Sequence, residues 1–495
     1  MPYKHGIFVQ EQATSILPPV TVDAGIPMIV GTAPVGMVDE KNVNKPVLCH
    51  TYAEAVAAFG FVPAETDGNV KRFKYSICET IYTTFALYGV APIIIVNVLD
   101  PAKHRKDAKA TTVAIDAISG SAVIGEPGII ESSVRISKTD GESTVTYTAG
   151  TEYELAYDDD GSLVISSLTG SDGAFLLPTG SELTFSAAVT DPGAVTSEDV
   201  IGGVNASGEK SGWELIDDVF PQFRIVPGTL IAPGYSGDSA VAAVMAAKAA
   251  SINGLFKAVS VVDVPTNEVR QYSNIPSWKN NKNIVSTHQM ACWPCLSLDG
   301  TVYSYSSHLA PLMARTDSRN NDVPYVSPSN QNLQCDATVL SDGTEVWMNN
   351  TTSSYLNGQG VVTAQNFIGG WVAWGNRTAC YPSNTDTKDA FIPVRRMFNW
   401  IGNTIVETYW SSVDFPINRR GIERIVDSVN IWLNGLAARQ YILGGRVEFL
   451  EDENPTTSLL DGIITFHLYV TPPAPAREIN FILEYDVNYL STLFE

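Results

Sequence analysis

The chain has 495 residues, more than one hydrophobic core usually serves, so we expect two to four domains. Hydrophobic residues make up 44% of it and charged residues 17%, a composition that excludes wholesale disorder. Its net charge of −22 disfavours direct binding to nucleic acid and to anionic membranes, because such a surface repels phosphate groups.

No segment of the sequence has the pattern of a signal peptide or a membrane span. The N-terminal stretch lacks an apolar core of the required length. The longest apolar run, Val90–Leu99, is interrupted by Pro92 and Asn97 and is about half of the roughly 20 residues that a span needs. We therefore expect a chain that is made and folded in a cytoplasm, with its six cysteines as reduced thiols.

Residues 1–24 have the pattern of an extended arm. The arm begins with a strand-like stretch, which consists of Gly6, Ile7, Phe8, Val9 and Gln10. Pro18 and Pro19 then favour an extended backbone. The intervening residues, about 14 of them, can span roughly 45 Å.

Residues 25–106 and 201–390 predict an α/β core domain. In the first part, strands at Ile26–Val30 and Ala91–Leu99 enclose two helices, at Thr51–Phe59 and Val70–Tyr88. In the second part we expect strands at Leu230–Ala232 and Ala258–Val264, with a helix at Ser239–Ser251 between them, and then short strands and turns over residues 284–390.

Residues 107–200 interrupt this pattern with an acidic, β-rich composition. They hold 16 acidic and 3 basic residues, and short alternating runs are separated by turns. A small inserted all-β domain is the simplest interpretation. Within it, Asp158-Asp159-Asp160-Gly161 could form a calcium loop, but it lacks the ligand spacing of an EF-hand, so we favour a hairpin turn.

Ser236 is a candidate catalytic nucleophile. It lies in Pro233–Asp238, between a predicted strand and a helix, where a hydrolase would place its G-x-S-x-G turn. The second glycine comes one residue early, and no histidine can be tied to Ser236. Ser236 or Asp238 is more simply the N-cap of the following helix.

Two further motifs have structural interpretations that we favour. Cys292 and Cys295 have redox or zinc spacing, but no second C-x-x-C follows, so we expect buried thiols. Trp371 and Trp374 could stack on a ligand, although core packing is simpler. Since P-loop, GxGxxG and HExxH motifs are absent from the sequence, we expect no enzyme, no metal and no cofactor.

Residues 391–470 predict an α+β C-terminal domain. Two helices are expected at Arg395–Tyr409 and Arg419–Ala438, from apolar residues spaced three and four apart. Two strands are expected at Arg446–Leu450 and Ile463–Val470. One face of the second strand carries Ile464, Phe466, Leu468 and Val470.

Residues 471–495 predict a second arm, formed by a stiff linker and a strand. The three prolines in Thr471–Ala476 favour polyproline II, about 19 Å over six residues. The alternating apolar residues that follow are Ile479, Phe481, Leu483 and Tyr485. A chain with a strand at each end can donate both to the sheets of neighbours, although folding back onto its own domain is an open alternative.

The chain resembles the sheath proteins of contractile phage tails and related injection particles. The resemblance rests on Tyr3–Glu11, Gly25–Gly36, Ile431–Gly445, Glu453–Pro455 and the proline-linked terminal strand. It implies hexameric rings stacked around an inner tube, contraction without nucleotide hydrolysis, and an insertion on the outer surface. It also implies that the donors are Ile7–Gln10 and Ile479–Tyr485, and that Ile464–Val470 is an acceptor strand.

This resemblance completes a set of expectations about partners and place. The partners would be neighbouring copies, the tail tube protein, and the baseplate and tail terminator proteins, with no direct nucleic-acid contact and no membrane insertion. The location would be the tail of a virion assembled in a bacterial cytoplasm. Two alternatives remain: the sheath of a headless contractile bacteriocin or injector, and a hydrolase that uses Ser236.

Overall fold

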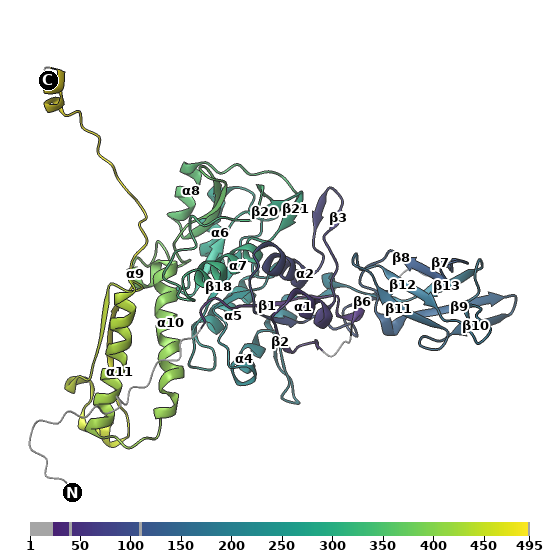
Figure 1. The fold of residues 1–495 in the computed structure, drawn as a ribbon, viewed down its shortest axis with the longest axis horizontal. Helices are drawn as coiled ribbons and strands as arrows, with labels where there is room; N and C mark the ends of the chain where they lie inside the picture. Colours follow the sequence, from purple (N-terminus) through teal and green to yellow (C-terminus); the bar gives the residue numbers. More distant parts are fainter. Residues whose placement is uncertain (1–22, 39–41, 108–110, 494–495) are drawn as a thin grey trace, which may run out of the picture.

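The computed structural model describes residues 23–38, 42–107 and 111–493. Figure 1 shows a central α/β body, with a β-rich extension on one side and a pair of long helices on the other. The protein has a mixed α/β fold. Among the described residues no helix has the length and apolarity that a membrane crossing requires.

An eight-stranded sheet forms the centre of the body. Its strand order is β2-β5-β1-β17-β18-β19-β23-β24, and the inner strands run parallel while β2 and β24 are antiparallel at the two edges. In chain order the strands are β1 (Pro27–Gly31), β2 (Pro46–Cys49), β5 (Ile93–Asn97), β17 (Thr229–Ile231), β18 (Val259–Asp263), β19 (Gln289–Cys292), β23 (Val361–Asn366) and β24 (Trp371–Trp374). Such short, continuous apolar runs are typical of strands buried on both faces.

Helices cover the sheet, and their ends follow from local sequence. Helix α1 (Tyr52–Phe59) is capped by Thr51, whose hydroxyl accepts a bond from the Glu54 N–H. Asp238 caps α5 (Ser239–Ala250) in the same way. The remaining helices of the body are α2 (Ser76–Ile81), α3 (Ser197–Ile201), α4 (Ile216–Phe223), α6 (Ile275–Asn281), α7 (Tyr305–Ser318), α8 (Asn350–Asn357) and α9 (Thr387–Ala390).

The helix expected over Val70–Tyr88 is shorter in the structure. Val70–Arg72 is instead strand β4, which pairs with β21 (Thr301–Tyr303) and β3 (Glu65–Asp67). The helical part begins at Ser76 and continues as one π-helical segment, Tyr82–Leu87. A small second sheet, in the order β22-β20-β21-β4-β3, also includes β20 (Cys295–Leu298) and β22 (Ala337–Val339).

Two facing sheets make up the β-rich extension (Figure 1). One has the order β10-β9-β13-β7 and the other β11-β12-β8. Their strands are β7 (Thr111–Ala114), β8 (Ser121–Ile124), β9 (Arg135–Asp140), β10 (Ser143–Tyr147), β11 (Tyr153–Tyr157), β12 (Leu163–Ser167) and β13 (Glu182–Ser186). Their apolar side chains form a separate core that includes Ile136, Leu163 and Phe185.

A two-stranded stalk joins the extension to the body. It consists of β6 (Arg105–Asp107) and β14 (Ala188–Thr190), which pair antiparallel. After the stalk, Val195 and Val200 belong to the hydrophobic cluster of the body. A short hairpin, β15 (Gly203–Val204) with β16 (Lys210–Ser211), follows. The division of the chain into domains at residues 107 and 200 stays a proposal.

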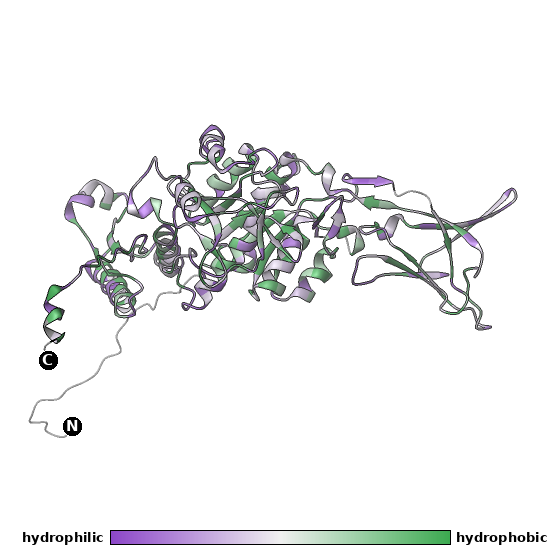
Figure 2. Ribbon diagram, turned by 90° about the horizontal axis from the view of Figure 1, so that it is seen from above, coloured by the Kyte–Doolittle hydropathy of each residue, from purple (hydrophilic) through white to green (hydrophobic). Residues whose placement is uncertain are grey.

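The C-terminal part consists of two long helices and a two-stranded sheet. Its elements are α10 (Ile392–Tyr409), α11 (Arg419–Ala438), β25 (Gly444–Glu448), α12 (Thr456–Leu460) and β26 (His467–Thr471). Apolar side chains of α11, among them Leu433 and Leu436, pack beneath the sheet against Val447 and Leu468. Figure 2 colours the ribbon by residue hydropathy, with hydrophobic positions in green and hydrophilic positions in purple.

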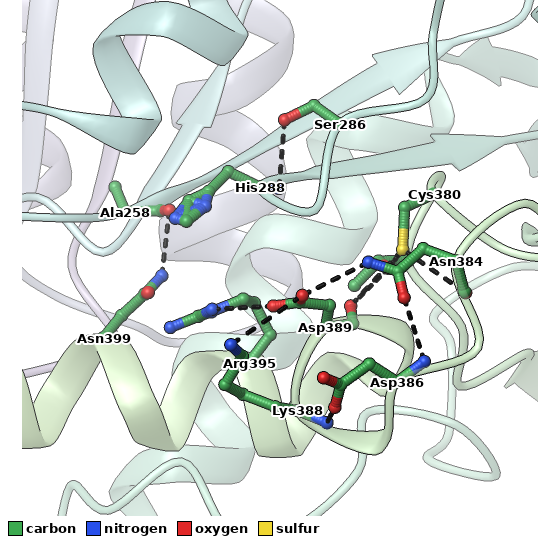
Figure 3. Close-up of polar contacts among 11 residues, drawn as sticks. Ala258, Ser286, His288, Cys380, Asn384, Asp386, Lys388, Asp389, Arg395 and Asn399 are labelled. Carbon is green, nitrogen blue, oxygen red and sulfur yellow. Dashed lines mark hydrogen bonds and ion pairs between the residues drawn. The ribbon is translucent and has the colours of Figure 1, made fainter.

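Polar contacts attach α10 to the body. The Asn399 side chain donates to the Ala258 carbonyl at 3.0 Å, and Arg395 pairs with Asp389 at 2.9 Å (Figure 3). Arg396, buried one turn away, forms an ion pair with Asp317 of α7 and also donates to the Ala24 carbonyl. Helix α10 therefore holds together the body, the C-terminal part and the segment around Ala24.

Candidate subunit interface

A cavity of about 760 Å³ lies at the carboxyl ends of the parallel strands. Ligands of α/β proteins commonly bind at this edge of the sheet. Ser236, Asp263 and Glu79 all line the cavity, so the hydrolase alternative can be tested directly on its geometry.

Ser236 is part of a structural hydrogen-bond network. Its hydroxyl donates to Asp263 Oδ2 at 3.4 Å and accepts from the Asp263 N–H at 3.0 Å. Among the described residues Ser236 has no hydrogen bond to a histidine, so the Ser-His pair of a hydrolase triad is not formed there. The buried serine joins the loop before α5 to the end of β18.

Asp263 and Glu79 hold the first turn of α7. The Ser306 N–H donates to Asp263 Oδ1 at 2.8 Å, and the Ser304 N–H donates to Glu79 Oε1 at 2.8 Å. Burial raises the pKa of Asp263 to about 6 and that of Glu79 to about 7. Both carboxyl groups thus accept hydrogen bonds from backbone N–H groups at the start of a helix. This structural role accounts for the two acidic residues that line the cavity.

The C-x-x-C cysteines are not activated. Cys292 ends β19 and Cys295 begins β20. Burial raises the pKa of the Cys292 thiol well above its ordinary value and that of Cys295 to about 12, so both are protonated at neutral pH. Neither belongs to a metal-binding cluster of described residues.

The triple-aspartate segment forms the turn between β11 and β12. The Ser162 N–H donates to Asp158 Oδ1 at 2.8 Å and to Asp160 Oδ1 at 2.9 Å.

Trp371 and Trp374 stand at the two ends of β24, and the Trp371 indole N–H donates to the Asp336 carbonyl at 2.9 Å. Both motifs have local structural partners.

The C-terminal arm leaves the body and remains exposed. Residues 472–486 form no helix or strand, and a short 3-10 helix, η10 (Val487–Leu493), ends the described chain. Figure 1 shows this segment running away from every other element. Phe481 is 86% exposed and Leu483 is 95% exposed, while Ile479 and Tyr485 are exposed to a similar degree. Its alternating apolar side chains are not buried against its own chain.

The strand that precedes this arm has an open edge. Among the described residues β26 pairs with β25 alone, with Leu468 opposite Val447. On the far side of β25, the Val447 N–H donates to Asn430 Oδ1 at 2.9 Å and its carbonyl accepts from Asn430 Nδ2 at 3.2 Å. Because antiparallel pairs alternate, the backbone groups of Leu468 and Val470 point away from β25. The outer edge of β25 is thus covered by α11, and the outer edge of β26 is open among the described residues.

The expected acceptor residues lie in and just before β26. Leu468 and Val470 belong to the strand, and Ile464 and Phe466 precede it. Thr465 is fixed by Asn454: its N–H donates to Asn454 Oδ1 at 2.7 Å and its carbonyl accepts from Asn454 Nδ2 at 2.9 Å. The sequence does not predict that Asn430 and Asn454 bind these backbone groups, since a lone asparagine gives no signal of the backbone that it caps.

The expected N-terminal donor, Gly6–Gln10, lies outside the described residues. The described chain starts at Asp23, and the Ala24 carbonyl accepts a bond from Arg396 at 3.3 Å. The described chain therefore begins beside α10, at the junction between the body and the C-terminal part.

Comparison with known proteins gives relatives along the whole chain. No protein-family model matches it. It is 29% identical to the tail sheath protein of Burkholderia phage BcepMu, over 99% of this chain and 98% of that protein. This chain is similar to a tail sheath protein along nearly its whole length. A putative prophage major tail sheath protein of Pseudomonas aeruginosa strain UCBPP-PA14 is 24% identical over 60% of this chain and 74% of its own length.

Solved sheath structures share the fold. The sheath of the extracellular contractile injection system PVC, in its contracted state, superimposes with a TM-score of 0.58 at 13% identity, over 99% of both chains. A chain of the anti-feeding prophage baseplate gives a TM-score of 0.57 at 15% identity, over 98% of this chain and 100% of that one. The sheath relatives are structural proteins and not enzymes, and the hydrogen bonds of the buried Ser236 agree with a structural role.

Proposed function

We propose that this protein is the structural subunit of a contractile sheath, and that its copies are linked by strand exchange. The observation that carries the proposal is that one chain has both an exposed apolar arm and an open strand edge. An arm that alternates apolar side chains can add to β26 of a neighbour, which supplies backbone hydrogen bonds. The sheath relatives support the same role.

The free energies of burying and ordering an arm explain why two arms would be needed. Burial of four apolar side chains contributes roughly 6–12 kcal/mol. Ordering of eight backbone residues costs roughly 8–16 kcal/mol. A single arm is close to break-even, but arms at both ends make the linkage multivalent. Subunits tied in this way could stack as hexameric rings and shift as rigid bodies without losing their connections.

In this proposal, the sheath surrounds an inner tube and its contraction drives that tube through a bacterial envelope. The partners are the tail tube, baseplate and tail terminator proteins, and assembly takes place in the host cytoplasm. A headless contractile particle would use the same subunit. Capsid and terminase genes beside the coding gene would indicate a phage, and their absence a headless particle.

The role of the C-terminal arm in linking subunits can be tested without disturbing the folded monomer. Phe481 and Leu483 are almost fully exposed, so the double substitution Phe481→Asp/Leu483→Asp should leave the melting temperature unchanged. In negative-stain micrographs the wild-type chain should form tubes or rings, and the variant should not. Asn480→Asp, on the other side of the same segment, is the matched control and should assemble. Tubes from the Phe481→Asp/Leu483→Asp variant would rule out linkage by this arm.

A further inference from the structure

A second cavity, of about 510 Å³, lies between the body and the start of the C-terminal arm. Pro475, Ala476, Arg477 and Glu478 form its arm side. On the body side it is lined by residues around the end of β24, including Arg377. Pro472, at the base of the arm, is buried. The arm is therefore held against the body here, before it becomes free at Ile479.

Arg377 is held rigidly beside this cavity. Its guanidinium carbon lies 3.7 Å from the centre of the Phe391 ring and 4.4 Å from that of Tyr381. Both rings are within cation–π distance of the guanidinium, so they hold the side chain in place while its N–H donors need other partners. The side chain is half-buried, so water solvates it incompletely.

The charge of Arg377 is not compensated by any carboxylate of the described residues. Neither an ion pair nor a side-chain hydrogen bond joins it to an acidic group among them, and none of the groups that shift its pKa is a carboxylate. The pKa of Arg377 is lowered by burial and also by the nearby Arg477. Arg395, by contrast, pairs with Asp389 (Figure 3).

The other charged residues at the cavity leave Arg377 without an acidic partner among the described residues. Arg477 pairs with Glu478 at 3.1 Å, and Glu478 also accepts a bond from the Asn480 amide at 3.2 Å. One arginine of the cavity is thus neutralised and Arg377 is not.

We propose that this cavity binds a carboxylate side chain of a second copy of the protein, with Arg377 as its partner. The inference rests on the proposed function, which brings copies into contact. A planar guanidinium fits a carboxylate through two parallel hydrogen bonds. Every copy has a net charge of −22, so a neighbour can readily present such a group. A neighbour bound here would touch the base of the arm and so fix the direction in which the arm leaves.

Chemical cross-linking tests the pairing directly. The substitution Arg377→Lys puts a primary amine beside the cavity. A water-soluble carbodiimide then joins this amine to a carboxylate that touches it: an amide bond forms, and the carbodiimide takes up the oxygen lost and becomes a urea. Mass spectrometry of digested tubes should find position 377 linked to an acidic residue of another copy. Mixed ¹⁴N and ¹⁵N chains establish that the link is intermolecular.

Polymerisation provides the second measurement. Arg377→Gln should raise the critical concentration for tube formation about tenfold or more, because it removes one partner of a desolvated ion pair. Arg270→Gln is the matched control: it loses the same charge from an exposed pair with Asp342, and should change the critical concentration less than twofold. Melting curves of the monomers establish that both variants fold.

The outcomes separate this inference from the proposed function. If tubes form, no intermolecular link to position 377 is found and Arg377→Gln polymerises like Arg270→Gln, the carboxylate site is wrong while the sheath function stands. Inorganic phosphate distinguishes a free-anion site. If millimolar phosphate raises the melting temperature of the wild-type monomer but not of Arg377→Gln, and no link forms, then a free anion and not a second copy occupies the cavity.

Discussion

Glu79 and Asp263 are carboxyl groups that the fold keeps away from water at the start of α7. Burial raises the pKa of Glu79 from 4.5 to about 7, and the nearby Asp263 adds to the effect. A folded pKa above the unfolded one means that the folded state binds the proton more tightly. The stability from protonated Glu79 is therefore complete below about pH 4.5 and is lost as the pH rises through about 7.

Glu79→Gln should remove this pH dependence, because the amide oxygen can still accept from the Ser304 N–H but cannot ionise. The free energy of unfolding of the wild type should fall between pH 5 and pH 8 by up to about 3 kcal/mol relative to the variant. Urea unfolding of the body across this range measures the difference. Glu345→Gln, an exposed change of the same charge, should run parallel to the wild type. If the free energy of unfolding of Glu79→Gln varied with pH just as that of the wild type does, Glu79 would not be a buried acid.

Element by element, the sequence predicted best where a helix has one apolar face. Helix α11 (Arg419–Ala438) has the predicted bounds, since its apolar residues recur every three or four positions. Helix α7 was not predicted, because it is buried on nearly all sides and contains Pro311, so it shows no such period. Strand β4 differs from the predicted helix start, because it is only three residues long and too short to show a strand period, although it pairs with the adjacent β3 as well as with β21.

The candidate interface was predictable in part. Alternation over Ile479–Tyr485 and the proline linker identified an extended segment, and the structure leaves it extended and exposed. The open edge of β26 was not predictable, because it depends on α11 covering the other edge through Asn430. Arg377 was not predicted either, because its stacking partner Phe391 is brought to it by the fold.

At the scale of elements, α10 should depend strongly on its buried ion pair with α7. Arg396→Met leaves the Asp317 carboxylate buried and unpaired, so the free energy of unfolding should fall by about 3–5 kcal/mol. The double variant Arg396→Met/Asp317→Asn removes the buried charge and should recover part of this loss. Chemical denaturation measures both. Equal losses for the single and double variants would show that packing, and not charge, is what Arg396 contributes.

At the scale of the whole molecule, the β-rich extension should be dispensable for folding and assembly. The stalk strands pair at Asp107 and Ala188, so residues 108–187 can be replaced by a short Asn-Gly turn. The body loses its contacts with Ile130 and Tyr157, which should cost about 2–4 kcal/mol. Circular dichroism and negative-stain microscopy should still show a folded chain that forms tubes. A folded chain that cannot polymerise would place the extension at a subunit contact.

Strand exchange is the central claim, and hydrogen exchange of the free chain and of assembled tubes tests it most directly. In the free chain the amides of Leu468, Val470 and Ile479–Tyr485 should exchange quickly, whereas that of Val447 is protected by Asn430 in both states. On assembly, the open edge of β26 and the arm should become protected together. Tubes in which Ile479–Tyr485 still exchanges at the rate of the free chain would contradict the account.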